Sequence, residues 1–173
     1  MPLTRRSLVQ GGSLLLAAVP VLGAVPLLAQ SAPSTPPPSK APDKGPKLDA
    51  DLVRHFVAAA HGNLEQTREL YASHNALVNA TWDWGGGDWE TGLGGAAHMG
   101  NQEIARFLLT QGARMDVFAA AMLGKIEIVR AFLADDPAVA NQKGPHGIPL
   151  VRHAVAGKQQ AVVDLLVAAG AKV

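Results

Sequence analysis

Two kinds of apolar segment alternate along the chain from Leu48 onward. An Ala-rich segment is followed by a glycine and a polar residue, and an amphipathic segment with large aliphatic side chains comes next. Because apolar positions recur at helical spacing, the pattern predicts helices in four pairs. The glycines at the centres of the pairs are Gly62, Gly100, Gly124 and Gly157. The expected helices cover residues 50–60, 64–73, 92–99, 101–111, 117–123, 125–134, 148–156 and 159–169.

The residue types explain why such pairs should stack. Small alanines let the first helix of a pair approach its neighbours closely, and glycine suits the turn that reverses the chain. Paired large residues lie eight and nine positions after each glycine, as Leu108 and Leu109 do after Gly100. One pair cannot cover its own apolar face, so we expect an all-α solenoid of four stacked pairs.

The repeated pattern resembles the ankyrin family, whose signature runs Thr-Pro-Leu-His, one residue, Ala-Ala, and then Gly. The family's His is absent from all four copies, where Phe56, Gly94, Phe118 and Val151 stand in its place. The resemblance implies a curved helical stack with a concave binding face, and it implies no chemistry. The second copy matches the family best, at Thr91, Leu93, Ala96, Ala97, Gly100, Glu103, Ile104, Leu108, Leu109, Gly112, Ala113 and Asp116.

The spacing of the glycines locates two irregularities. The usual period is about 33 residues, and the spacing from Gly124 to Gly157 matches it. The spacing from Gly62 to Gly100 is longer by about five residues, which indicates an insertion. The spacing from Gly100 to Gly124 is shorter by about nine residues, so the finger there should be nearly absent. We expect Asp116 to cap the following helix directly.

The first 30 residues have the form of an export signal. Arg5 and Arg6 precede an apolar run that Pro20 and Pro26 interrupt, so a membrane-spanning helix is a poor interpretation. The paired arginines resemble the twin-arginine motif, which favours a periplasmic location over other export routes. Cleavage after Ala29, Ser31 or Ala32 fits a small-residue rule equally well, and an uncleaved anchor is the alternative. We therefore divide the chain into a signal at 1–30, a Pro-rich disordered linker at 31–47 and the repeat domain at 48–173.

The composition excludes several classes of function. The sequence has no cysteine, which excludes disulfides, thiol chemistry and thiolate metal sites. The formal net charge is +1 and falls to about −1 without Arg5 and Arg6. A near-neutral chain without a basic cluster gives no support for binding to nucleic acid. Any contact with a membrane should involve only the signal segment, if it is not cleaved.

The insertion contains all three tryptophans of the chain and is the strongest candidate for a binding site. Gly85 to Gly87 should allow a sharp reversal that brings two aromatic and acidic arms together. Clustered carboxylates beside indole rings suit a cationic group of a partner, or a sugar ring. The alternative is that some of these rings pack onto the first two repeats. The candidate partner-binding residues are Trp82, Asp83, Trp84, Asp88, Trp89 and Glu90.

Metal binding and catalysis receive less support from the sequence. His55 and His61 are not spaced for one helix face, and His61 and His98 lie near equivalent turns but out of register by one position. His74, His146 and His153 show no recognisable ligand spacing, and His153 stands at an alanine position where it should be packed. We therefore assign no metal, no cofactor and no catalytic residue, because no nucleophile elbow, phosphate loop or His-Glu-x-x-His motif occurs.

These observations predict a protein-interaction module of the periplasm or exported fraction. In view of the repeat architecture we expect the partner to be another protein, which should bind the concave face and the loop at residues 81–90. The alternative is a domain that binds a small molecule or a carbohydrate at the same loop, with weak hydrolysis as an extension.

Overall fold

A computed structural model describes residues 45–172 of the chain. The expected signal at 1–30 and nearly all of the expected linker lie outside these residues. None of the helices in the described part is long and apolar enough to cross a membrane. The helices are α1 (Ala50–Ala59), α2 (Leu64–Ser73), α3 (Gly92–His98), α4 (Gln102–Thr110), α5 (Val117–Met122), α6 (Ile126–Asp135), α7 (Leu150–Ala156) and α8 (Gln160–Ala168). The shorter elements are η1 (Asn75–Asn79), β1 (Thr81–Asp83), β2 (Trp89–Thr91), η2 (Pro137–Asn141) and η3 (Pro145–Gly147).

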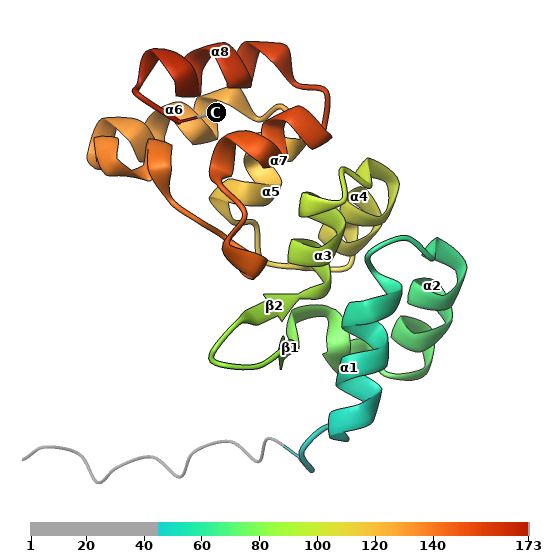
Figure 1. The fold of residues 1–173 in the computed structure, drawn as a ribbon. Coiled ribbons are helices and arrows are strands. Elements are labelled where there is room, and N and C mark those ends of the chain that lie inside the picture. The colour runs from blue at the N-terminus through green and yellow to red at the C-terminus, as the bar shows by residue number, and fades with distance from the viewer. Residues whose placement is uncertain (1–44, 173) are drawn as a thin grey trace, which may run out of the picture. The chain divides into compact units, whose positions relative to one another are not determined.

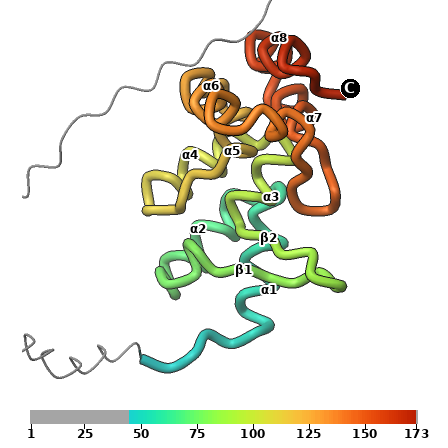
Figure 2. The backbone as a smooth tube through the Cα atoms, turned by 90° about the vertical axis from the view of Figure 1, so that its left-hand side faces the viewer, coloured from blue at the N-terminus to red at the C-terminus, as the bar shows by residue number. Residues whose placement is uncertain are grey.

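The described part is predominantly helical, which confirms the all-α prediction. All eight expected helices are present, and their ends agree with the expected ones to within about two residues. Helices α1 and α2, α3 and α4, α5 and α6, and α7 and α8 form four pairs, and successive pairs pack against one another (Figures 1 and 2).

Side-chain caps fix where most of the helices begin. The cap of α5 is Asp116, whose Oδ1 accepts a hydrogen bond from the backbone N–H of Ala119 at 2.7 Å, as expected from the sequence. Thr91 caps α3 in the same way and thereby sets the point where the strand β2 gives way to helix. The other side-chain caps of α-helices are Asp49, Asn63 and Asn101.

The core consists of two clusters of buried apolar side chains. The first includes Phe56, Leu93 and Leu108, and it extends from α1 through α4 to part of α5. The second includes Leu150 and Leu166 and occupies the space among α5 to α8. Alanines line the close contacts between the first helices of the pairs, because their small side chains let the helix axes approach. The fully buried alanines of α3 and α5 are Ala96, Ala97, Ala119, Ala120 and Ala121.

The glycines between paired helices have different roles. Gly100 has a positive φ of 70°, as expected for a glycine in a reversing turn. Gly157 has a φ of −77° and is required for another reason: a Cβ there would collide with the backbone carbonyl of Met122. The left-handed conformation in that turn belongs to Lys158, with a φ of 57°. Gly62 has neither a positive φ nor a close neighbour, so the sequence-based explanation does not hold at Gly62 and Gly157.

Replacing Gly157 with alanine is expected to destabilise the fold by about 1–3 kcal/mol, because the new methyl group must displace the α5 backbone. The matched control is Gly62→Ala, which adds a methyl group in open space and should change the free energy of unfolding by less than about 0.5 kcal/mol. Urea denaturation of both variants measures the difference. Equal stability of the two variants would contradict the packing between α5 and α7.

Two fingers project from the stack on the same side. The first is the antiparallel hairpin of β1 and β2, in which Trp82 pairs with Glu90. The second is the loop before α7, closed by a bridge between Lys143 and Pro149 and containing η3. The two fingers lie close together in both views (Figures 1 and 2) and are joined by hydrogen bonds from His146 to Asp88.

Candidate metal centre

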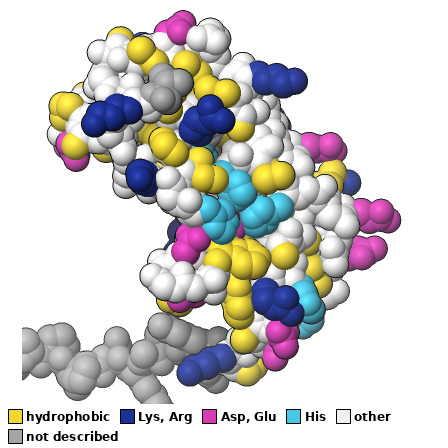
Figure 3. Space-filling view, in the orientation of Figure 1, with side chains coloured by type: hydrophobic (Ala, Val, Ile, Leu, Met, Phe, Trp, Pro, Cys, Tyr) yellow, Lys and Arg dark blue, Asp and Glu magenta, His cyan; other side chains and the backbone are white. Residues whose placement is uncertain are grey.

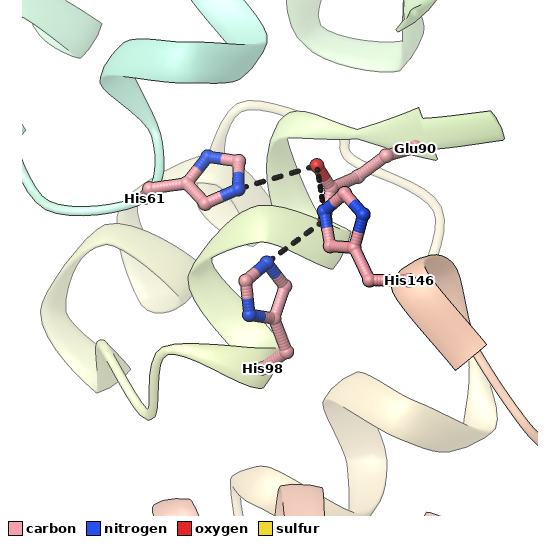
Figure 4. A group of neighbouring side chains, drawn as sticks. All are labelled: His61, Glu90, His98 and His146. Atoms are coloured by element: carbon pink, nitrogen blue, oxygen red, sulfur yellow. Dashed lines mark ion pairs between the residues drawn. The ribbon is translucent and has the colours of Figure 1, made fainter. Parts of the chain in front are cut away.

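Four side chains converge where the two fingers meet the stack. His61 lies in the turn after α1, Glu90 on β2, His98 at the end of α3 and His146 in η3. One nitrogen from each imidazole and one carboxylate oxygen lie within 4.8 Å of one another. Figure 4 shows the three rings approaching the Glu90 carboxylate from three separate segments.

The hairpin explains why Glu90 points inward. Gly85, Gly86 and Gly87 all have positive φ, and Asp83 Oδ1 accepts hydrogen bonds from the backbone N–H groups of Gly85 and Gly87 at 2.9 and 3.2 Å. This tight turn confirms the expected reversal. Because side chains alternate along a strand, Glu90 faces inward and is 1% exposed, whereas the preceding Trp89 faces away and is 60% exposed.

The distances from Glu90 to the three imidazoles are of the size found within a metal site. Glu90 Oε2 lies 3.3 Å from His61 Nε2 and 3.4 Å from His146 Nε2, and Glu90 Oε1 lies 3.1 Å from His98 Nε2. Ligand atoms at the corners of a tetrahedron around zinc, with bonds of about 2.0–2.1 Å, are about 3.3 Å apart. Two of the measured distances run to Oε2 and one to Oε1, and each is close to the separation of neighbouring ligands around zinc.

Two buried atoms of the cluster are left without hydrogen bonds. Within residues 45–172, neither Glu90 Oε1 nor His98 Nε2 has a hydrogen-bond partner, although they are only 3.1 Å apart. The two atoms are close but not aligned for a hydrogen bond, which depends on angle as well as on distance. Buried polar atoms without partners are rare in folded proteins. A cation between these atoms would satisfy both.

Hydrogen bonds determine which imidazole nitrogens are available as ligands. His61 Nδ1 lies 2.9 Å from the carbonyl of Val57, and His146 Nδ1 lies 2.7 Å from Asp88 Oδ2. A carbonyl or a carboxylate only accepts, so we assign the proton to Nδ1 in both rings. The Nε2 atom of each neutral ring then carries the lone pair and faces Glu90. The Asp88–His146 pair has the form of the carboxylate–histidine–metal arrangement of metalloproteins.

Asp88 holds His146 by two atoms. Its Oδ1 accepts from the His146 backbone N–H at 2.8 Å while its Oδ2 accepts from the ring. His146 has a φ of 58°, in the left-handed region that non-glycine residues adopt at a cost. Such a conformation persists where surrounding contacts stabilise it, and here the two hydrogen bonds to the Asp88 carboxylate do so.

Glycines of α3 make room for two side chains of the site, since Gly95 lies beside the His61 ring and Gly94 beside Glu90. A Cβ at Gly95 would lie 2.8 Å from the ring, closer than real Cβ atoms approach their neighbours. The His61 and His98 rings pack edge to face with centroids 4.8 Å apart, and those of His98 and His146 with centroids 5.2 Å apart. The Gly-Gly sequence at 94–95 thus supports the site and not only the packing of helices.

The electrostatics favour an ionised carboxylate at the centre. Burial alone would raise the pKa of Glu90, but His61, His98 and the Trp84 indole N–H together lower it from 4.5 to about 2. The Glu90 carboxylate in turn raises the pKa of His61 above its ordinary value of 6.5. The backbone N–H of His146 lowers the pKa of Asp88.

The site is partly open to solvent. The side chains of His61 and His146 are 24% and 32% exposed, whereas those of His98 and Glu90 are 9% and 0% exposed. In the space-filling view, histidine side chains gather at the inner end of a hollow in the face (Figure 3). An ion could therefore reach the buried carboxylate past two accessible imidazoles.

The six residues proposed from the sequence as partner-binding have different surroundings. Trp82 is half-buried and packs against the first core cluster. Trp84 is 39% exposed and donates from Nε1 to Glu90 Oε2 at 2.7 Å. Only Trp89 projects freely. The three carboxylates make contacts within the protein. Asp83 closes the turn, Asp88 accepts hydrogen bonds from His146, and Glu90 lies among the histidines.

The histidines are the part that sequence reasoning did not find. His61, His98 and His146 come together, while His55 and His74 are exposed elsewhere. His153 is fully buried against Phe118, as expected for a packed side chain. The one available signal was the near-equivalence of His61 and His98 in successive turns. Nothing in the sequence connects His146 to Asp88, 58 residues away.

Without metal, the cluster should make stability depend on pH in a specific way. The pKa of Glu90 is lowered, so its contribution is present above about 4.5 and is lost as the pH falls towards 2. The pKa of His61 is raised, so its contribution is present below 6.5 and is lost as the pH rises through the raised pKa. In chelator, stability should therefore fall as the pH rises above 6.5.

With bound zinc the sign above pH 6.5 should reverse, because zinc binds neutral imidazole and protons compete with it. Urea unfolding at a series of pH values, in EDTA and in zinc, measures both slopes. Identical slopes in the two conditions would show that the cluster is an ion-pair network and not a metal site.

No protein-family model matches the chain, and no curated protein is significantly similar to it in sequence.

Proposed function

We propose that this protein binds a divalent transition-metal ion, zinc first among them, through His61, Glu90, His98 and His146. The observation that carries the proposal is the convergence of three imidazole nitrogens on a buried carboxylate whose Oε1, like His98 Nε2, lacks a hydrogen bond. Ion pairing alone would leave this mismatch unexplained, whereas a cation at the centre explains it.

The ligand types restrict the choice of metal. Three nitrogens and one oxygen suit Zn²⁺, Co²⁺, Ni²⁺ or Cu²⁺, whereas Mg²⁺ and Ca²⁺ take sites built from oxygen. Four protein ligands fill a tetrahedral site, and filled sites are typical of metals that bind without catalysing. We therefore propose that the ion is held or carried, and that no substrate is transformed at it.

The scaffold is proposed to be of the ankyrin type, as the sequence resemblance implies. The four stacked helix pairs with projecting fingers support this proposal. The metal site uses two such fingers, of which the first is lengthened by the Trp- and Gly-rich insertion. Export through a twin-arginine signal remains part of the proposal, which places metal binding in the periplasm.

Binding of a protein partner is a second candidate function, favoured by Trp89. This indole is 60% exposed on the outer face of the hairpin, away from the metal ligands. Trp89→Ser should abolish partner recovery from a periplasmic extract while leaving zinc binding unchanged. Unchanged recovery by the folded variant would remove Trp89 from the proposal.

The test of metal binding is stoichiometry. Chain stripped with chelator, dialysed and then titrated with zinc chloride should bind one zinc ion per chain, as measured by calorimetry and elemental analysis. His98→Ala should lose this binding, because it removes a buried ligand. The matched control is His74→Ala, which removes an exposed histidine outside the cluster. Equal binding by both variants would contradict the proposed site.

A further inference from the structure

Trp84 contacts the metal cluster without being able to act as a ligand. Its indole Nε1 donates to Glu90 Oε2 at 2.7 Å, a short hydrogen bond to an ionised group. Indole nitrogen is a donor only, so it cannot bind a cation through a lone pair. The ring also packs near His61 and His146, with centroids 6.0 and 6.1 Å away.

The hairpin fixes the position of this indole. The backbone N–H of Trp84 donates to the carbonyl of Asp88 at 3.0 Å, across the glycine turn that Asp83 closes. The same turn carries Asp88, which holds His146. One short hairpin therefore sets the position of the carboxylate ligand, the indole that contacts it and one imidazole ligand.

The two oxygens of Glu90 differ as a result. Oε2 already accepts a hydrogen bond from Trp84, whereas Oε1 accepts none from any residue in the described part. A carboxylate that binds a metal through both oxygens must direct a lone pair of each towards the ion. The indole N–H engages one of the two lone pairs of Oε2 and draws its charge away from the ion, so it weakens binding through Oε2 and favours binding through Oε1 alone.

We propose that Trp84 is a positioning residue that restricts Glu90 to one metal-binding oxygen and so keeps the site four-coordinate. The inference rests on the proposed metal binding and deepens it, because coordination number decides between metals. Zinc and cobalt accept a tetrahedral set of three nitrogens and one oxygen, whereas nickel and copper(II) favour tetragonal or higher-coordinate sites. Trp84 thus favours zinc over nickel.

Cobalt is the probe that reports coordination number directly. Tetrahedral Co²⁺ absorbs strongly in the visible region, and five- or six-coordinate Co²⁺ absorbs weakly. The wild-type chain loaded with Co²⁺ should show the strong bands. Trp84→Phe removes the N–H and keeps an aromatic ring, so Oε2 becomes free to bind and the bands should weaken. The control is Trp89→Phe, which changes an exposed indole on the other face of the same hairpin.

Competition titrations between zinc and nickel supply a second measurement. Trp84→Phe should reduce the ratio of zinc affinity to nickel affinity by roughly tenfold, a change of the size that outer hydrogen-bond partners of a metal site produce. Loss of structure alone would weaken both metals together and leave the ratio unchanged. An unchanged ratio with unchanged cobalt bands in the variant would overturn the role of Trp84, while the proposed function would stand.

The wild-type chain provides a test that needs no variant. In the zinc-bound form, the indole N–H proton of Trp84 should exchange slowly with solvent in NMR spectra, and that of exposed Trp89 should exchange rapidly. Equal, rapid exchange of both protons would overturn the inference. If neither zinc nor cobalt binds to the wild-type chain, the proposed function itself fails.

Discussion

Glu90→Gln is expected to lower zinc affinity by more than about 100-fold. The amide is nearly the same size as the carboxylate and can still accept from Trp84, so the fold should survive. It is neutral, however, and removes the only negative charge within the ligand set. Because loss of an outer hydrogen-bond partner costs about 10–100-fold, loss of the anionic ligand should exceed this range.

Competition against a chromophoric chelator measures the affinity of each variant. Asp88→Asn should show an intermediate loss of about 10–100-fold, because it weakens the hold on His146 without removing a ligand. Glu65→Gln, which changes an exposed acid on α2, serves as the control for charge and should bind as the wild type does. An affinity of Glu90→Gln within about threefold of wild type would contradict the role of the carboxylate.

Saturating zinc is expected to raise the melting temperature by on the order of 10 °C. Binding to the folded state alone stabilises it by about 4 kcal/mol when free zinc exceeds Kd by 1,000-fold. For a folded part of this size, each kcal/mol shifts the melting temperature by a few degrees. The ligands come from two helix pairs and two fingers, so few of them would be close together in the unfolded chain.

Thermal denaturation followed by circular dichroism, with zinc and with chelator, measures this shift. The double variant His61→Ala and His146→Ala should lose it while keeping its helical signal, because both side chains lie partly at the surface. Exposed His55 and His74 offer the matched double replacement, which should retain the full shift. A shift of equal size in both double variants would mean that zinc acts elsewhere.

The helices could be predicted from the sequence because each depends on local information. Helical spacing of apolar residues, alanines at close contacts and a cap such as Asp116 all act within a few residues of where they occur. The chain reversal at Gly85 to Gly87 was also predictable, because these glycines separate two similar arms, but the pairing of the arms as strands was not predicted. The glycine turns were predicted less well, since at Gly157 the constraint comes from Met122 on another helix.

Only part of the candidate site could be predicted from the sequence, for a physical reason. Asp88 and Glu90 belong to one short loop, so local composition indicated them. The three histidines belong to different segments, and only the stacking of helix pairs and the contact between fingers bring them together. Tautomers and buried unpaired atoms, such as Oε1 of Glu90, depend on the full three-dimensional arrangement.

X-ray absorption spectroscopy of the zinc-loaded chain tests the central claim most directly. We expect a single site with three imidazole nitrogens and one carboxylate oxygen, all at about 2.0–2.2 Å from the metal. The His98→Ala variant should show no bound zinc. A spectrum from the wild-type chain dominated by water oxygens, or with no histidine contribution, would contradict the proposed metal centre.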